Sequence, residues 1–354
     1  MTEKKDLIGL NRSELESLAH EAGQPEFRGR QLFRALHKRR LQSFEEMTDL
    51  PTELRQQLSE TTQISSLRIE SRHHSSDGTC RYLLKTLDGH PVETVFIPEK
   101  NRDTICFSSQ SGCPLQCEFC LTAQLGLIRN LTPGEIVGQI IIALNESYGA
   151  GVPTPRGTNL VGMGAGEPFL NYDALITALK LMADPEGLHI VPKRVTVSTA
   201  GVVPRIRDLA RLAIQDGRPR LAISLSAPTD ELRDRLMPIN RKWPLSELLS
   251  ACREFQNSLK AQERVTFEYV LLAGVNDADE QARQLANLLN KHQLLAKVNL
   301  IPHNSAEPLE FRPPTEERII KFKRILESKG VAAFVRKPRG RDVYAACGQL
   351  AART

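Results

Sequence analysis

Short runs of β-branched and aliphatic residues alternate with longer amphipathic stretches along the chain from Thr104 onward. Each run has six to eight residues, and most are followed by a stretch with apolar positions at helical spacing. The runs are TICFSS at 104–109, NLVGMG at 159–164, RVTVST at 194–199, RLAISL at 220–225, VTFEYVLL at 265–272 and KVNLIP at 297–302. Because strands separated by helices pair in parallel through crossover connections, the pattern predicts an α/β fold, as an open sheet or a barrel.

Two of the predicted helices carry clear start or stop signals. One begins after Thr132, an N-cap residue that is followed by Pro133 and by Glu135 at the capping-box position. The other spans residues 315–329, and Gly330 supplies its C-terminal stop. Both stretches are therefore predicted as helices that connect strands.

The first 90 residues lack this regular alternation. Their pattern predicts short helices at 13–22, 27–40 and 44–49, followed by weak strands at 64–97. We therefore expect two domains: a small N-terminal helical accessory domain at 1–90, and a larger domain at 91–354 that carries the candidate chemistry.

Positive charge is concentrated in two segments. The chain has 354 residues, with 47 lysines and arginines against 42 acids. Residues 27–44 carry six basic side chains and no acid, and residues 336–341 carry four more. Such patches suit a polyphosphate partner such as RNA, although a charge run is also typical of a solvated helix face.

The composition is that of a soluble globular protein, with 40% hydrophobic and 25% charged residues. No apolar run is long enough to span a bilayer, and the first 25 residues lack the apolar segment of a signal peptide. We expect a cytoplasmic protein with no membrane partner. Seven cysteines, an odd number without an export signal, favour a metal site or catalysis over a disulfide framework.

Four of these cysteines lie within 15 positions, at and after the end of the first predicted strand. They are Cys106, Cys113, Cys117 and Cys120, so the last three have the spacing C-x3-C-x2-C. A structural zinc site needs four ligands and would require Cys106 as the fourth thiolate. A fully ligated iron–sulfur cluster also takes four cysteines, so three thiolates would leave one iron open.

Glycine and polar residues follow the other predicted strands. The carboxyl ends of parallel strands meet at one edge, where ligands of sheets and barrels of this kind bind. A glycine-rich turn lets the backbone approach a small zwitterion, and a glutamate within it can accept a hydrogen bond from an ammonium group. The candidate residues at these strand ends are Gly166, Glu167, Ser198, Ser224, Leu225, Ser226 and Asn304. A single serine of this kind is usually a satisfied loop hydroxyl, so their joint placement carries the prediction.

The cysteine loop resembles the signature of the radical S-adenosylmethionine (SAM) enzymes. The resemblance implies a partial (β/α)6 barrel in which Cys113, Cys117 and Cys120 hold a [4Fe–4S] cluster, with SAM bound at its open iron. It implies that an electron from the cluster splits SAM, and that the 5′-deoxyadenosyl radical abstracts hydrogen from an unactivated carbon. The residues at the other strand ends would bind SAM.

Several segments resemble, more narrowly, the radical SAM RNA methyltransferases of the RlmN/Cfr family. They are VETVFIP at 92–98, GAGEP at 164–168, RVTVSTAGVVP at 194–204, LAISLSAP at 221–228, MPIN at 237–240, EYVLLAGVND at 268–277, NLIPHN at 299–304 and VRKPRGRDVYAACGQL at 335–350. The resemblance implies methylation of C2 of an adenine in 23S ribosomal RNA, and also of an adenine beside the anticodon of transfer RNA. A sister group methylates C8 of the same ribosomal adenine, but the NLIP and VRKPRG stretches favour the C2 group.

The resemblance also assigns three catalytic roles. A first SAM methylates Cys347, and a second SAM provides the radical that takes hydrogen from the S-methyl group. The methylene radical adds to the base, and Cys106 then releases the product by forming a disulfide with Cys347. Glu93 is the acid–base residue that removes the C2 proton. We further expect an electron donor such as flavodoxin or ferredoxin, and a monomer.

Three positions depart from the family's pattern. Ala165 stands where methionine is usual, Ser226 replaces a histidine, and Tyr344 stands where an acid is commoner. These positions touch the SAM pocket and its rim, so a divergent paralogue with another RNA substrate stays open. The sequence also leaves two different classes of protein open: a radical SAM enzyme that acts on another kind of molecule, and a zinc-stabilised RNA-binding protein without catalysis.

Overall fold

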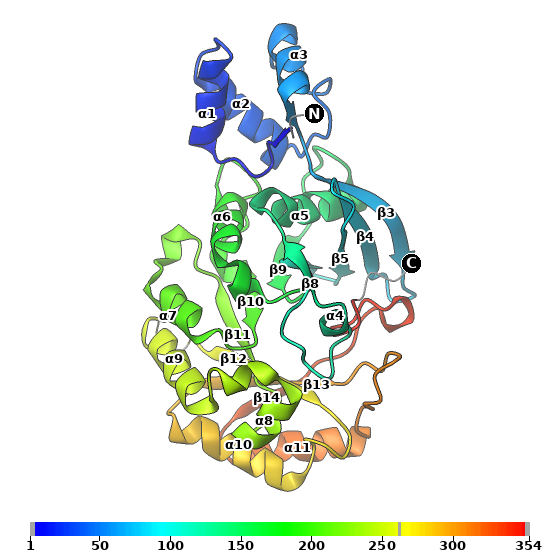
Figure 1. Ribbon diagram of the computed structural model, residues 1–354, viewed down its shortest axis with the longest axis vertical. Helices are drawn as coiled ribbons and strands as arrows, with labels where there is room; N and C mark the ends of the chain where they lie inside the picture. Colours follow the sequence, from blue (N-terminus) through cyan, green and yellow to red (C-terminus); the bar gives the residue numbers. More distant parts are fainter. Residues whose placement is uncertain (1–3, 261–262, 351–354) are drawn as a thin grey trace.

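The computed structural model describes residues 4–260 and 263–350, and its main feature is one open sheet (Figure 1). Among these residues the sheet has ten strands, in the order β14-β13-β12-β11-β10-β9-β6-β5-β4-β3. In chain order they are β3 (Leu67–His74), β4 (Cys80–Thr86), β5 (Pro91–Pro98), β6 (Arg102–Cys106), β9 (Gly157–Gly162), β10 (Val195–Thr199), β11 (Arg220–Ser224), β12 (Val265–Leu271), β13 (Ala296–Pro302) and β14 (Ala332–Val335). Strands β3 and β14 form the two edges, so the sheet does not close into a full barrel.

The predicted α/β fold with a partial barrel is confirmed. All six runs are strands, β6 and β9 to β13, and neighbouring strands from β6 to β14 pair in parallel. The sequence pattern does not predict β14, because four residues are too short a run to show a period. Strands β3 to β5 extend the parallel part with antiparallel pairing.

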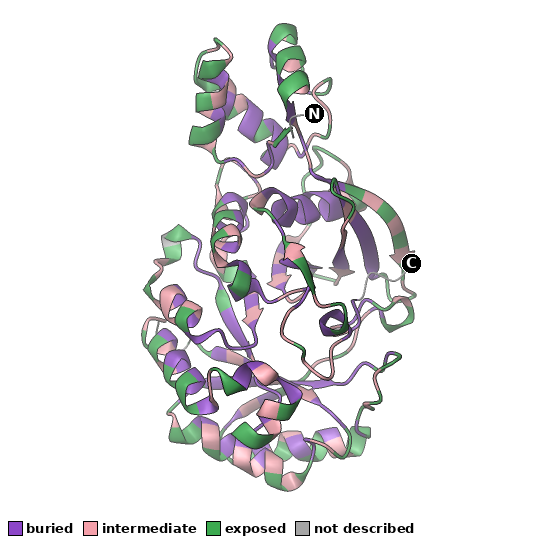
Figure 2. Ribbon diagram, in the orientation of Figure 1, coloured by how far each residue is buried: buried purple, intermediate pink, exposed green. Residues whose placement is uncertain are grey.

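Helices connect the parallel strands and cover the outer face of the sheet (Figure 1). They are α5 (Pro133–Tyr148), α6 (Tyr172–Ala183), α7 (Val203–Arg211), α8 (Asp230–Leu236), α9 (Leu245–Asn257), α10 (Asp279–Lys291) and α11 (Glu316–Ser328). Thr132 and Glu135 form the predicted capping box of α5. The buried helix faces and the strands share one core, and Figure 2 shows exposed residues on the outer helix faces. None of the described helices is long and apolar enough to cross a bilayer.

The N-terminal region is helical. It contains α1 (Arg12–Glu21), α2 (Phe27–Phe33) with a π-helical extension at Arg34–Lys38, and α3 (Thr52–Thr61). A short parallel pair, β1 (Lys5–Asp6) with β2 (Thr62–Gln63), joins its two ends. The sequence pattern does not predict α3.

The helix predicted at 44–49 is wrong, since this segment consists of turns. The carboxylate of Glu46 accepts hydrogen bonds from the backbone N–H groups of Gln42 and Ser43. Such local bonds favour turns over a helix, and Pro51 disfavours helical geometry at the residue before it.

The sheet crosses the expected domain boundary near residue 90. Strands β3 and β4 pair with each other, and β4 pairs with β5 beyond the boundary. The division at 1–90 and 91–354 therefore stays a prediction, and the helical part that stands apart from the sheet ends near α3 (Figure 1).

Arg40 attaches the helical region to the sheet domain. Its guanidinium donates hydrogen bonds to Oδ1 of Asn145 at 2.9 Å, to the carbonyl of Gly149 at 3.0 Å and to that of Val152 at 2.7 Å. Only 5% of the residue is exposed, and burial lowers the pKa of Arg40. Arg40 therefore belongs to the interior rather than to the basic surface.

We predict that Arg40→Gln lowers the free energy of unfolding by about 3 kcal/mol, because it removes a buried guanidinium and its hydrogen bonds to Asn145, Gly149 and Val152. The matched control is Lys38→Gln, an exposed position in the same segment, for which the change should stay within about 0.5 kcal/mol. Urea titration followed by circular dichroism measures both. Equal stability of the two variants would contradict the assignment of Arg40 to the interior.

Candidate active site

The cysteine loop lies between β6 and α5 and has its own small scaffold. Strand β7 (Gln110–Gly112) pairs antiparallel with β8 (Leu127–Asn130), and the short helix α4 (Leu121–Gln124) begins directly after Cys120. Gly112 has a φ of +75°, and a Cβ at this position would collide with the carbonyl oxygen of Gly126. A glycine is therefore required where the loop turns back on itself.

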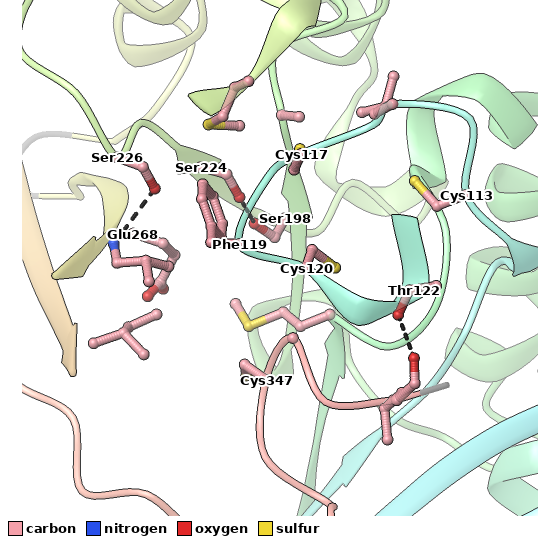
Figure 3. A pocket seen from close by; sticks show the side chains of 18 of the residues that line it. Cys113, Cys117, Phe119, Cys120, Thr122, Ser198, Ser224, Ser226, Glu268 and Cys347 are labelled. Carbon is pink, nitrogen blue, oxygen red and sulfur yellow. Dashed lines mark hydrogen bonds between the residues drawn. The ribbon is translucent and has the colours of Figure 1, made fainter. Parts of the chain in front are cut away.

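Three thiols of this loop, those of Cys113, Cys117 and Cys120, line one cavity at the carboxyl ends of the parallel strands (Figure 3). Burial raises the pKa of Cys113 to about 12, and it also raises the pKa values of Cys117 and Cys120. Thiols this buried ionise only when a cation compensates the charge, and an all-sulfur donor set suits iron–sulfur clusters. The residues present therefore fit such a cluster.

Cys106 does not join the other three cysteines. It is buried in a separate apolar group with Val95, Ala345 and Leu350, and it is not among the residues that line the cavity. Across the described residues, no three His, Cys, Asp or Glu side chains form a site for a single metal ion. The arrangement gives no support to a four-thiolate zinc site.

Glu167 lies at the end of the glycine-rich turn that follows β9. Its Oε1 accepts a hydrogen bond from the N–H of Phe169 at 3.0 Å, and its Oε2 accepts one from the N–H of Ala200 at 2.7 Å. The residue is 2% exposed, and burial raises its pKa. Gly166 has a φ of +101°, and a Cβ there would lie 2.6 Å from Cβ of Gln110. The glycine allows this close approach and so fixes the direction of Glu167 into the cavity.

The predicted serines come together on neighbouring strands. The Oγ atoms of Ser198, on β10, and Ser224, on β11, are 3.3 Å apart, and both line the cavity (Figure 3). Ser226 also lines it and has a φ of +51°, and its Oγ accepts a hydrogen bond from the N–H of Val270. The side chain of Leu225 is fully buried in the core instead, so this residue does not face the cavity.

Cys347 lines the same cavity, although it is distant in sequence (Figure 3). The loop that carries it is tied to α4 by two hydrogen bonds. The N–H of Leu121 donates to the carbonyl of Gly348 at 2.9 Å, and the hydroxyl of Thr122 donates to the carbonyl of Leu350 at 2.6 Å. Nδ2 of Asn304 donates to the carbonyl of Cys347 at 3.2 Å.

Asn304 therefore holds the backbone at Cys347 in this structure, and its Oδ1 accepts a further hydrogen bond from Nε of Arg341. Glu93 lies on β5 and is not among the residues that line the cavity. One of its carboxylate oxygens is 2.7 Å from Nη1 of Arg81, and both side chains are buried.

Comparisons with known proteins agree over nearly the whole chain. The Radical SAM superfamily model matches residues 107–286, and the Ribosomal RNA large subunit methyltransferase N-terminal domain matches residues 5–64. The Dual-specificity RNA methyltransferase RlmN of Anaeromyxobacter dehalogenans is 47% identical, over 98% of this chain and 92% of the relative. The chain belongs to the RlmN family.

Two further relatives support membership of the RlmN family. The Dual-specificity RNA methyltransferase RlmN of Geobacter sulfurreducens is 47% identical, over 98% of this chain and 91% of that protein. The crystal structure of a radical SAM methyltransferase from Sphaerobacter thermophilus has a TM-score of 0.93 at 42% identity, with 99% of this chain and 100% of that chain covered. Membership implies a [4Fe–4S] cluster and SAM as cofactors.

Three residues at the site of this RlmN-family chain were not predicted as site residues. Arg233 is fully buried and donates to the carbonyls of Ala200, Ser224 and Leu225, so it holds the turn between Ser224 and Ser226. Burial lowers the pKa of Arg233 to about 10. The sequence gives no signal for Arg233, because an arginine in a helix is ordinarily exposed and the family resemblance in this region covers only MPIN at 237–240.

Glu268 and Arg336 line the cavity as well. Oε1 of Glu268 accepts a hydrogen bond from Nδ2 of Asn299 at 2.8 Å, and its Oε2 lies 3.8 Å from Nη1 of Arg336. The negative charge of Cys347, and to a smaller extent that of Glu268, raises the pKa of Arg336. The sequence placed Arg336 in a basic surface patch, because the pattern does not show that the end of β14 turns toward the cavity.

We predict that Glu167→Gln weakens SAM binding by about tenfold to a hundredfold, because in the role that the resemblance gives Glu167 the carboxylate accepts a charge-assisted hydrogen bond from the SAM ammonium group. Isothermal titration of SAM into the anaerobically reconstituted protein measures the dissociation constant. Glu118→Gln is the control, since Glu118 lies on the cysteine loop but pairs outward with Arg235 at 3.6 Å. Equal losses in both variants would contradict the role of Glu167.

Proposed function

We propose that the protein methylates C2 of an adenine in 23S ribosomal RNA, and an adenine in transfer RNA, through a methylated Cys347. The names of the relatives support an RNA substrate, and the similarity to the ribosomal RNA methyltransferase N-terminal domain supports ribosomal RNA. Two SAM molecules are consumed in each turnover, one for the methylation of Cys347 and one for hydrogen abstraction.

The observation that carries the proposal is the docking of the Cys347 loop on the cysteine loop. The hydrogen bond from Leu121 to Gly348 joins the residue after Cys120 to the residue after Cys347. A methyl group on Cys347 therefore lies in the cavity that three other thiols line. An RNA methyltransferase that used direct attack on SAM would have no need of a cysteine there.

In the proposed site, Cys113, Cys117 and Cys120 would hold the cluster. Glu167 would accept a hydrogen bond from the SAM ammonium group, and the hydroxyls of Ser198, Ser224 and Ser226 would orient the rest of SAM. When bound, the cluster and SAM together supply hydrogen-atom abstraction from an unactivated carbon. The residues of the chain bind and orient the reactants, and they exclude water from the cavity.

Cys347 and Cys106 act in sequence. C2 of adenine is an electron-poor carbon without a lone pair, so it cannot attack a SAM methyl group directly. The carbon on the sulfur of Cys347 bonds to C2 first. The adduct gives up one electron, which the bound cluster would take up, and the proton at C2 is removed. The thiolate of Cys106 then attacks the sulfur, the carbon–sulfur bond breaks with its electron pair left on the carbon, and a proton completes the methyl group. An external reductant restores the two thiols. Cys106 packs with Ala345 and Leu350, which stand on either side of Cys347 in the sequence, and this packing supports the proximity of the two cysteines.

Glu93 is the proposed base for the C2 proton. The guanidinium of Arg81, 2.7 Å from its carboxylate, holds that carboxylate in place. We also propose a monomeric, cytoplasmic enzyme that takes its electrons from a flavodoxin or ferredoxin.

The product test uses SAM with a deuterated methyl group, the reconstituted protein, a reductant and a fragment of 23S ribosomal RNA. We predict a 2-methyladenosine that retains two of the three original deuterium atoms, because one is removed from the Cys347 methyl group. Mass spectrometry of the digested nucleosides measures it, and Cys347→Ala is the control that should give none. A product that keeps all three deuterium atoms, or an 8-methyladenosine, would contradict the proposal.

The exposed basic residues of the helical region are the proposed RNA contact. Arg34 and Lys38 are exposed and Arg39 is partly exposed, whereas Arg40 is buried and must stay intact. We predict that changing the first three to glutamine weakens RNA binding at least about tenfold at low salt, because each phosphate contact releases counterions. The slope of affinity against salt concentration should also flatten. Unchanged affinity and slope in filter-binding titrations would exclude this surface.

A further inference from the structure

The segment that leads to Cys347 combines exposed cations with an exposed aromatic ring. Residues 336–344 carry four basic side chains, one acid and Tyr344, which is 43% exposed. Lys337 and Arg341 are exposed, and Arg339 is partly exposed. Cations interleaved with an aromatic side chain are the usual composition of a surface that binds unpaired nucleic acid.

Tyr344 is held in an unusual backbone conformation. Its φ is +53°, in the left-handed region that a bulky side chain rarely adopts. The N–H of Ala345 donates to the carbonyl of Gly340 at 2.9 Å and so closes the turn around Tyr344. The turn fixes the backbone at Tyr344, and the side chain lies at the surface.

The turn is anchored on the hairpin between β3 and β4. The carboxylate of Asp342 accepts hydrogen bonds from the hydroxyl of Ser75 at 2.6 Å and from the N–H of Ser76 at 3.0 Å. The N–H of Gly340 donates to the carboxylate of Asp77 at 3.1 Å. Asp342, the one acid of the segment, is therefore engaged by the hairpin.

Among the described residues, the side chain of Tyr344 makes no hydrogen bond and no ring contact, whereas the side chain of Asn304 holds the backbone of Cys347. Tyr344 precedes Cys347 by three positions, and such a segment spans at most about 11 Å. A nucleotide next to an adenine at Cys347 is therefore within reach of the ring.

We propose that Tyr344 is a stacking platform for an unpaired base beside the target adenine, and that Lys337, Arg339 and Arg341 contact the adjoining phosphates. The inference rests on the proposed function, because it takes RNA as the substrate. Stacking on a fixed ring selects an unpaired nucleotide rather than a particular base. Tyr344 thus favours an adenine in a loop over one in a duplex.

The test measures dissociation constants of the reconstituted protein for the 23S fragment by fluorescence anisotropy. The variants are Tyr344→Asn, which removes the ring but tolerates a positive φ, and Tyr344→Phe, which keeps the ring. Each is titrated with the intact fragment and with fragments that carry one abasic site at each of the two nearest positions on either side of the adenine. Leu295→Asn, at an exposed apolar position before β13, is the matched control.

We expect Tyr344→Asn to weaken binding about tenfold, as the loss of one stacked base does. Tyr344→Phe and Leu295→Asn should stay within about twofold of the unchanged protein. For the unchanged protein, an abasic site at one of these positions should weaken binding by the same factor of about ten. For Tyr344→Asn, the same abasic site should cause no further loss of binding.

Equal binding of the intact fragment by Tyr344→Asn and the unchanged protein would overturn the stacking role. The role would also be overturned if an abasic site weakened binding by Tyr344→Asn as much as it weakens binding by the unchanged protein. Analysis of the nucleosides from the same samples for 2-methyladenosine distinguishes a failure of the stacking role from a failure of the proposed function. Methylated RNA with equal binding refutes only the stacking role, whereas the predicted binding losses without 2-methyladenosine refute only the proposed reaction.

Discussion

The contact between the Cys347 loop and the cysteine loop is the constraint on which the rest of the site depends. Its main elements are one backbone bond, from Leu121 to Gly348, and one bond from the buried hydroxyl of Thr122 to Leu350. These bonds fix the backbone on the C-terminal side of Cys347. Cys347 thereby lines the cavity before any substrate arrives.

The parallel sheet explains why distant segments meet there. Three groups of cavity residues lie at or after the carboxyl ends of strands. They are the glycine-rich turn after β9, the serines of β10 and β11, and Asn304 after β13. Parallel strands place these ends along one edge, so each segment contributes to one wall of the cavity. The antiparallel strands β3 and β4 add a hairpin that anchors the approach to Cys347 through Asp342.

Much of this arrangement can be predicted from the sequence. The strands have clear β-branched runs, and their polar ends coincide with the cavity. The buried interactions cannot be predicted in this way. Arg233 and Arg40 read as surface charges but are buried donors to backbone carbonyls, since only the folded chain shows which carbonyl groups lack a partner. Leu225 lies between two cavity residues in sequence, yet its side chain points into the core.

The most direct test of the account is a trapping experiment with Cys106→Ala. If Cys347 carries the carbon and Cys106 resolves the adduct, this variant should stop with the RNA fragment bonded to the protein. Nuclease and protease digestion followed by mass spectrometry should then locate an adenine joined through one carbon to Cys347. Release of free 2-methyladenosine RNA by the variant, or an adduct on another residue, would contradict the account.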